Sequence, residues 1–161
     1  MIFVQAICGD TKPTAQMKSV EKIAHENGHR YELVRIPTEA DTRLACISAD
    51  NYRMDRACIE PEMVWVDWDV EIMALPILEP GTPAFVYGIA GDPPQPDCSY
   101  FYVNGCCDFF TALLAERDRR GILPSVYGWP QKVLRDKNVQ KITPSSYIHN
   151  RVSMSKIFAK I

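Results

Sequence analysis

Apolar residues in the first seventy positions follow two spacings, one typical of strands and one typical of helices. Short apolar or alternating runs predict strands at residues 2–7, 31–36 and 63–66. Between them, apolar residues three or four positions apart predict helices at residues 14–26 and 41–58. Strands that alternate with helices in this way are typical of a parallel sheet with helices on its faces.

The second half of the chain is less regular. Two further apolar runs, at residues 84–89 and 99–103, predict strands separated by a segment rich in Gly and Pro. Apolar residues from Phe109 onward predict a helix that ends in the charged stretch 116–120. From Pro124 the sequence is rich in loop-forming residues and ends in a basic tail.

The composition fits one globular domain covering residues 1–161. The chain is 47% hydrophobic and 24% charged, so it can bury an ordinary core and differs from a disordered protein. The net charge of −2 argues against nucleic-acid binding, because a basic surface is the electrostatic footprint of such proteins. No apolar run reaches the roughly 18 residues of a membrane span, and the start lacks a basic leader. We therefore expect a cytoplasmic protein whose six cysteines are reduced thiols.

Two carboxylates follow the third predicted strand. Asp67 and Asp69 flank Trp68 directly after the apolar run 63–66. If the strand continues past Asp67, both carboxylates point the same way, because residues two apart share one face. Two like charges this close are unfavourable unless a cation lies between them, and carboxylate oxygens are ligands that Mg²⁺ and Mn²⁺ accept. The pattern predicts a divalent metal site at the carboxyl end of a buried strand.

This segment and the helix before it carry a family resemblance. Asp50 and Arg53 lie three residues apart in the run 48–53, and thirteen residues separate Arg53 from Asp67. The two motifs in this order resemble glycosyltransferases with a DXD sugar-binding region, a family that includes fungal initiating mannosyltransferases and large glucosylating toxins. The chain differs from the family pattern in having Ala49 before the helix aspartate and Pro61-Glu62 before the strand.

The resemblance implies a fold and an activity. The fold would be GT-A-like, an α/β nucleotide-diphospho-sugar transferase domain with a mixed, mostly parallel sheet flanked by helices. Residues 1–76 would bind the nucleotide sugar, and residues 77–161 would form the acceptor side and C-terminal tail. The activity would be a hexosyltransferase-like transfer from a UDP or GDP sugar to a saccharide or other small acceptor, dependent on Mn²⁺ or Mg²⁺.

The resemblance also implies roles for individual residues. Asp69 would bind the metal directly, and Asp67 would contact the metal and the donor ribose. Asp50 and Arg53 would hold donor sugar hydroxyls, with Arg53 also near the phosphates. The end of the first strand would lie against the nucleotide base and ribose, at Ala6, Ile7 and Cys8.

Candidates near the C-terminus each have an alternative interpretation. His149 resembles the C-terminal position from which related enzymes supply a further metal ligand, and Lys156 would meet the diphosphate. Both residues also fit a solvated tail.

Candidates in the middle of the chain have alternatives as well. Asn104 falls where the resemblance places a contact to donor or acceptor, but Asn-Gly is also a simple turn. Asp108 and Asp97 are candidates for acceptor contact or base catalysis, although Asp108 also suits a helix N-terminus and Asp97 a loop. Trp68 is expected beside the metal. Trp129 is expected either in an acceptor wall or in a packed loop.

Two other functions remain open from the sequence. Asp67 and Asp69 would also suit a metal-dependent nucleotidyl or phosphoryl transferase, although the chain has no phosphate loop of the G-x-x-x-x-G-K-[ST] type. A non-catalytic nucleotide-sugar-binding protein with the same fold is the third possibility.

Overall fold

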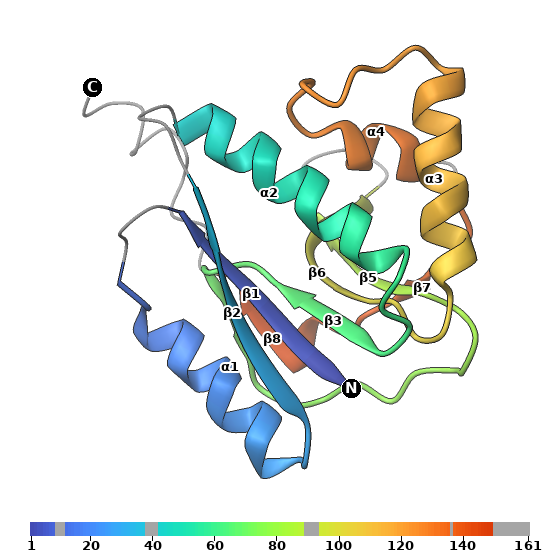
Figure 1. Cartoon of the computed structure of the whole chain (residues 1–161). Helices are drawn as coiled ribbons and strands as arrows, with labels where there is room; N and C mark the ends of the chain where they lie inside the picture. Colours follow the sequence, from blue (N-terminus) through green and yellow to red (C-terminus); the bar gives the residue numbers. More distant parts are fainter. Residues whose placement is uncertain (9–11, 38–41, 89–93, 136, 150–161) are drawn as a thin grey trace.

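The computed structural model describes residues 1–8, 12–37, 42–88, 94–135 and 137–149 (Figure 1). Six strands form the main sheet, in the order β2-β1-β3-β6-β5-β7. Their bounds are Ile2–Cys8 for β1, Arg30–Ile36 for β2, Met63–Val66 for β3, Ala84–Gly88 for β5, Gln95–Tyr102 for β6 and Gln140–Lys141 for β7. Three of the five strand pairings are parallel, those of β1 with β2, β1 with β3, and β5 with β7. The predicted fold class, a mixed and mostly parallel sheet flanked by helices, is confirmed.

Helices cover both faces of the main sheet (Figure 1). Their bounds are Ala15–Glu26 for α1, Thr42–Ala57 for α2, Cys107–Arg119 for α3 and Trp129–Leu134 for α4. Alternate residues of β1 serve the two faces: Ile2 and Val4 belong to the core beneath α2, α3 and α4, whereas Phe3 belongs to the core beneath α1. A strand buried on both faces explains the continuous apolar run at the start of the sequence.

The ends of the first helix follow the signals in the sequence. The Thr14 hydroxyl accepts a hydrogen bond from the Met17 amide at 3.2 Å and caps the N-terminus of α1. The helix ends at Asn27, and Gly28 reverses the chain with a φ of 71°, a conformation that glycine adopts without strain. The chain then enters β2, parallel to β1.

Short elements in the second half differ from the prediction. A two-stranded sheet pairs β4, Val70–Ile72, with β8, Tyr147–His149, which follows the 3-10 turn Pro144–Ser146. Strand β6 begins at Gln95 rather than Ser99, although Pro96 lies within it. Pro96 has no N–H to donate. It is tolerated because β3 pairs only with residues 100–102 of β6, so no strand pairs with Pro96 on the β3 side. Helix α4 and strands β7 and β8 lie in the segment from Pro124 that the sequence predicted to be rich in loops, and β4 lies where no element was predicted.

No helix in the described part of the chain is long and apolar enough to cross a membrane.

Candidate active site

The carboxyl ends of β1, β2 and β3 meet at one edge of the main sheet, which we call the carboxyl edge. The three strands are parallel, and Cys8 pairs with Ile36 at this edge. The buried Gln5 side chain joins β1 to the residue after β3, because its Nε2 lies 3.4 Å from the Asp67 carbonyl oxygen. Tyr31 on β2 donates its hydroxyl to Gln5 Oε1 at 3.0 Å. The structure therefore places Ala6, Ile7 and Cys8, which end β1, at the same edge as Asp67.

Asp67 and Asp69 lie on a turn and not on one strand. Strand β3 ends at Val66, and Trp68 and Asp69 form a turn before β4 begins at Val70. The Val70 amide donates to the Asp67 carbonyl oxygen at 3.1 Å, which closes the turn. Strand alternation does not align the two carboxylates, because the strand does not continue past Asp67, as that expectation required.

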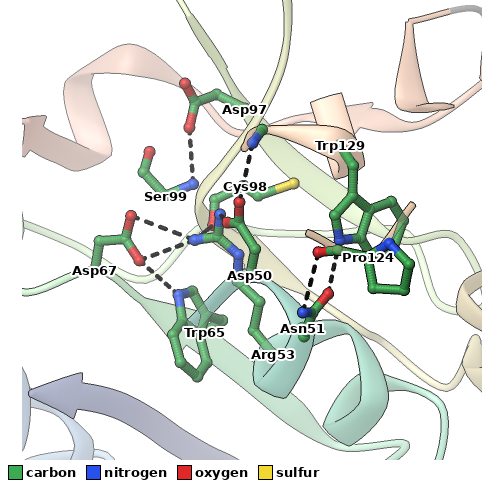
Figure 2. Close-up of polar contacts among 11 residues, drawn as sticks. Asp50, Asn51, Arg53, Trp65, Asp67, Asp97, Cys98, Ser99, Pro124 and Trp129 are labelled. Carbon is green, nitrogen blue, oxygen red and sulfur yellow. Dashed lines mark hydrogen bonds and ion pairs between the residues drawn. The ribbon is translucent and has the colours of Figure 1, made fainter. Parts of the chain in front are cut away.

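The Asp67 carboxylate is held by two donors from different elements (Figure 2). Trp65 donates its indole N–H to Oδ1 at 2.7 Å, and Arg53 Nη1 on α2 lies 3.1 Å from Oδ1 and 3.4 Å from Oδ2. These contacts fix the orientation of the side chain, whose exposed fraction is 29%. Both oxygens retain acceptor capacity for a further partner.

Arg53 and Asp50 form the buried part of the same network. Arg53 Nη2 pairs with Asp50 Oδ1, and Arg53 Nη1 also donates to the Cys98 carbonyl oxygen on β6 at 3.0 Å. Asp50 Oδ2 accepts from the Gly128 amide at 3.3 Å. Arg53 and Asp50 are only 5% and 4% exposed. Their charges are therefore used mainly within the protein, to connect α2, β6 and the turn after β3.

Burial controls the titration of this network. Burial raises the pKa of Asp67 to about 6, and the nearby carboxylates of Asp69 and Asp97 add to the rise, although Arg53 and the Trp65 N–H oppose it. Burial also disfavours the Arg53 charge, but the carboxylates of Asp50 and Asp67 outweigh it and raise the pKa of Arg53. A further positive charge near Asp67 would consequently stabilise its ionised form.

The residues around Asp69 complete the carboxyl edge. Asp69 is partly buried and lies two residues after Asp67 on the turn, and its charge adds to the rise in the pKa of Asp67. Trp68 between them is 40% exposed, and Thr14 Oγ1 lies 3.4 Å from its carbonyl oxygen. The backbone of His149 on β8 pairs with Val70, the residue after Asp69. The side chain of His149 lies outside what the structure describes.

These residues fit a hard divalent cation only in part. In the described residues no group of three or more His, Cys, Asp or Glu side chains is arranged to hold a metal ion. The pair Asp67 and Asp69 supplies the oxygen donors that Mg²⁺ and Mn²⁺ prefer, and such ions often keep water and substrate phosphate oxygens as their other ligands. A cation held by two carboxylates and completed by a diphosphate is compatible with this arrangement.

Strand β6 contains a bulge whose backbone bonds to Asp67. The register between β5 and β6 shifts after Phe85, so that Val86 pairs with Asp97, and residues 98–100 have no partner on β5. The Asp67 amide donates to the Ser99 carbonyl oxygen at 2.7 Å, and Asp97 Oδ1 accepts from the Ser99 amide at 2.8 Å. The Asp97 charge acts on both Asp67 and Arg53. The bulge thus brings Asp97 to the site, where the sequence had suggested a loop residue.

Two candidates lie at the opposite edge of the sheet. Strand β6 is antiparallel to β3, so β6 ends where β3 begins, and the Val103 amide donates to the Met63 carbonyl oxygen. Asn104 follows this strand and donates from Nδ2 to the Glu79 and Thr82 carbonyl oxygens, at 2.6 and 2.8 Å. Asp108 is exposed in the first turn of α3. The structure does not bring Asn104 or Asp108 to Asp67, from which the length of β3 separates them.

Two other candidates have different outcomes. Trp129 is fully buried in the core and donates its indole N–H to Asn51 Oδ1 at 2.9 Å, so it is a packed residue and not an exposed acceptor wall. Lys156 lies outside the described residues.

The fold is shared with a glycosyltransferase of known structure. The crystal structure of a glycosyltransferase involved in the glycosylation of the major capsid of PBCV-1 matches with a TM-score of 0.61 and 12% identity, over 96% of each chain. The glycosyltransferase GlyE of Streptococcus pneumoniae TIGR4 matches with a TM-score of 0.49 and 12% identity, over 88% of this chain and 44% of that chain. No protein-family model and no curated protein matches the sequence. The first likeness confirms the predicted glycosyltransferase fold.

Proposed function

We propose that this protein is a metal-dependent glycosyltransferase that moves a sugar from a UDP or GDP sugar to a saccharide or other small acceptor. The observation that carries the proposal is the oriented Asp67 carboxylate, held by Arg53 and Trp65 beside Asp69 at the carboxyl edge. In open α/β sheets, ligands bind at this edge. The fold, shared over nearly the whole chain with a glycosyltransferase, supports the same assignment.

The donor would enter along the ends of the parallel strands. In this proposal the base and ribose lie against Ala6, Ile7 and Cys8, and the diphosphate extends toward the turn at Asp67. Residues 1–76 then form the donor half and residues 77–161 the acceptor half. The Gln5 side chain holds the turn against β1, so the two parts of the donor site keep a fixed spacing.

Asp67 and Asp69 would hold Mn²⁺ or Mg²⁺, with His149 as a further ligand from β8. A divalent cation at this place supplies a Lewis acid that stabilises negative charge on the leaving diphosphate. The chain itself fixes the orientation of the Asp67 carboxylate through Arg53 and Trp65. Placing the reactants in this way lowers the entropic part of the barrier.

Asp50 and Arg53 act as positioning residues in this account. Both are buried and paired with each other, and Arg53 also pairs with Asp67, so they set where the Asp67 carboxylate points. This role replaces the direct contact with donor hydroxyls that the resemblance implied. Asp97, brought to the site by the bulge in β6, is our candidate for contact with the acceptor.

Thermal denaturation with a ligand panel tests the proposal. The panel contains UDP, GDP, UDP-glucose, GDP-mannose and ATP, each with Mn²⁺, with Mg²⁺ and with EDTA. A ligand that binds only the folded state raises the melting temperature, so a diphosphate nucleotide should stabilise the protein only when metal is present. A preference for ATP would instead indicate nucleotidyl or phosphoryl transfer. The absence of any nucleotide effect would refute both activities.

A further inference from the structure

The segment before α4 is fastened to α2 by one asparagine. Asn51 Nδ2 donates to the Pro124 carbonyl oxygen at 3.2 Å, and Asn51 Oδ1 accepts from the Trp129 indole N–H at 2.9 Å (Figure 2). Pro124 and Trp129 are the two ends of a six-residue loop, which we call the 124–129 loop. A single side chain therefore holds both ends of this loop against α2.

A third contact ties the same loop to the site. The Gly128 amide donates to Asp50 Oδ2, the residue before Asn51 and the partner of Arg53. Gly128 has a φ of 66°, in the left-handed region, where a side chain would be strained. Glycine at this position lets the chain turn toward Asp50 before α4 begins. The loop is thus built to lie at a defined place beside the Asp50–Arg53–Asp67 network.

Tyr127 is the residue that this loop presents. Its backbone lies between the anchored Gly128 and the half-buried Val126, and its side chain remains 44% exposed. Burial of the rest of this side chain raises the pKa of Tyr127. The charges of Asp50 and Asp67 add to the rise, and that of Arg53 opposes it. The phenol therefore lies next to the candidate active site, with much of its ring open to solvent.

The distribution of exposed aromatic side chains supports a role in binding. Across the described ranges, only two Phe, Tyr or Trp side chains are exposed, Trp68 at 40% and Tyr127 at 44%. Trp68 is adjacent to Asp67 in the chain, and Tyr127 precedes Gly128, whose amide bonds to Asp50 in the network that Arg53 extends to Asp67. Exposed aromatic surface is unfavourable in water, and its restriction to the surroundings of one carboxylate indicates a ligand that covers it.

Polar atoms without a protein partner lie beneath the same part of the surface. Three buried side-chain atoms have no hydrogen-bond partner among the described residues: Arg53 Nε, Ser99 Oγ and Gln131 Oε1. Arg53 and Ser99 contact Asp67 directly or through the backbone, and Gln131 Oε1 would lie 3.6 Å from a β-carbon at Gly128. These atoms are themselves buried, so the group that a ligand at the surface can reach is the Asp67 carboxylate, whose exposed fraction is 29%.

We propose that Tyr127 forms the aromatic wall of a saccharide subsite beside Asp67. The inference rests on the proposed glycosyl transfer and adds the residue that binds a sugar ring there. A pyranose has apolar C–H faces that pack on an aromatic ring, while its hydroxyl groups bond to carboxylates, amides and hydroxyls around it. The ring bound at Tyr127 belongs either to the donor sugar or to the acceptor, and the binding experiment separates these two sources.

The test compares Tyr127→Ala and Tyr127→Phe with Leu123→Ala as the matched control. Leu123 lies just before the loop, is 64% exposed and has no place in the proposed site. All three variants should fold, because the changed side chains are substantially exposed. Isothermal titration with Mn²⁺ plus UDP or GDP should give the same affinity for every variant and the wild type, because the bare nucleotide does not reach Tyr127.

The sugar-containing ligands should respond to loss of the ring. If the donor sugar packs on Tyr127, Tyr127→Ala binds UDP-glucose or GDP-mannose about tenfold more weakly, the size expected for about 1.4 kcal/mol of lost contact. If the acceptor packs there, donor affinity is unchanged and kcat/KM for a saccharide acceptor falls about tenfold. Tyr127→Phe keeps the ring and should stay within about twofold of wild type in either case. A Tyr127→Ala variant that equals Leu123→Ala in both measurements overturns the inference.

Saturation-transfer NMR with methyl glycosides separates this inference from the proposed function. Glycosides that bind the wild type and lose binding in Tyr127→Ala would support the subsite even if no nucleotide binds, in which case only the proposed function fails. Nucleotide sugars that bind wild type and Tyr127→Ala equally, with equal acceptor kinetics, would leave the function standing and remove the subsite. A wild type that binds neither glycosides nor nucleotides refutes both.

Discussion

Arg53 Nη1 lies 3.1 Å and 3.4 Å from the two carboxylate oxygens of Asp67, and this contact joins the middle of α2 to the turn after β3. The same nitrogen donates to the Cys98 carbonyl oxygen, so one guanidinium connects a helix, a turn and the bulge in β6. The residue that orients the proposed metal ligand therefore also holds three elements of the fold together. Changes at Arg53 should affect stability and binding at once.

Replacing Arg53 by Ala should destabilise the protein by about 3–5 kcal/mol, because Asp50 and Asp67 would be left without their buried counter-charge. Urea unfolding of the apo protein measures this free energy. Arg119→Ala is the control, since Arg119 pairs with Glu116 in an exposed ion pair, and its unfolding midpoint should stay close to that of the wild type. A loss below about 1 kcal/mol in Arg53→Ala would mean that the network does not hold the fold.

Nucleotide binding with Mn²⁺ should strengthen as the pH rises through about 6, because a proton and a cation compete for the Asp67 carboxylate. The stability of the apo protein has the opposite trend at this group. The pKa of Asp67 is raised above the ordinary value of 3.8. The stability that protonated Asp67 contributes to the folded state is therefore fully present below pH 3.8 and is lost as the pH rises through about 6.

Trp65→Phe isolates the contribution of Asp67 to this pH dependence, because the titration of the nucleotide itself is common to both proteins. Without the indole N–H, which bonds to Asp67 Oδ1 at 2.7 Å, the charged carboxylate loses a donor and its pKa should rise. Isothermal titration over a pH series should therefore place the midpoint of binding higher in Trp65→Phe than in the wild type. Identical midpoints would show that Asp67 does not control metal-dependent binding.

Asn51→Ala should cost about 1–2 kcal/mol of stability, because both hydrogen bonds that fasten the 124–129 loop are lost. It should also weaken binding of sugar-containing ligands, since Tyr127 is no longer held at the site. Asn104→Gly is the matched control: it loses the contacts to Glu79 and Thr82 at the other edge of the sheet, and glycine accepts the φ of 54° at this position. Urea unfolding should report losses in both variants, and titration should report weaker binding only in Asn51→Ala. Equal effects on binding would contradict our placement of the site.

The first three strands and two helices could be predicted from sequence because their signals are local. Each carries a complete apolar pattern, and some end at residues that stop the element, as α1 does at Asn27 and Gly28. Strands β4 and β8 have only three residues each and are defined by pairing between distant segments. Such short elements depend on tertiary contacts that no local pattern reports.

The site could be predicted only where the parallel strands determine it. Asp67 and Arg53 were identified from their motifs, but the turn that holds Asp69 was not, because alternation along a strand assumes that the strand continues. Asn104 was a candidate because the resemblance places a donor or acceptor contact after that strand, with a simple turn as the alternative. The antiparallel direction of β6 moves that strand end to the opposite edge, and direction is not visible in a single strand's sequence. No sequence pattern indicated Tyr127, since the loop that carries it is placed by the tertiary contacts of Asn51 and Gly128.

The central claim, that Asp67 and Asp69 hold a divalent cation which binds the donor diphosphate, is tested most directly by titrating UDP and GDP into Asp69→Asn in the presence and absence of Mn²⁺. Asp108→Asn is the control, since Asp108 is an exposed aspartate at the opposite edge of the sheet. We expect Asp108→Asn to bind like the wild type, and Asp69→Asn to fold normally but lose the part of the affinity that depends on Mn²⁺. Metal-dependent nucleotide affinity that is unchanged in Asp69→Asn would contradict the account.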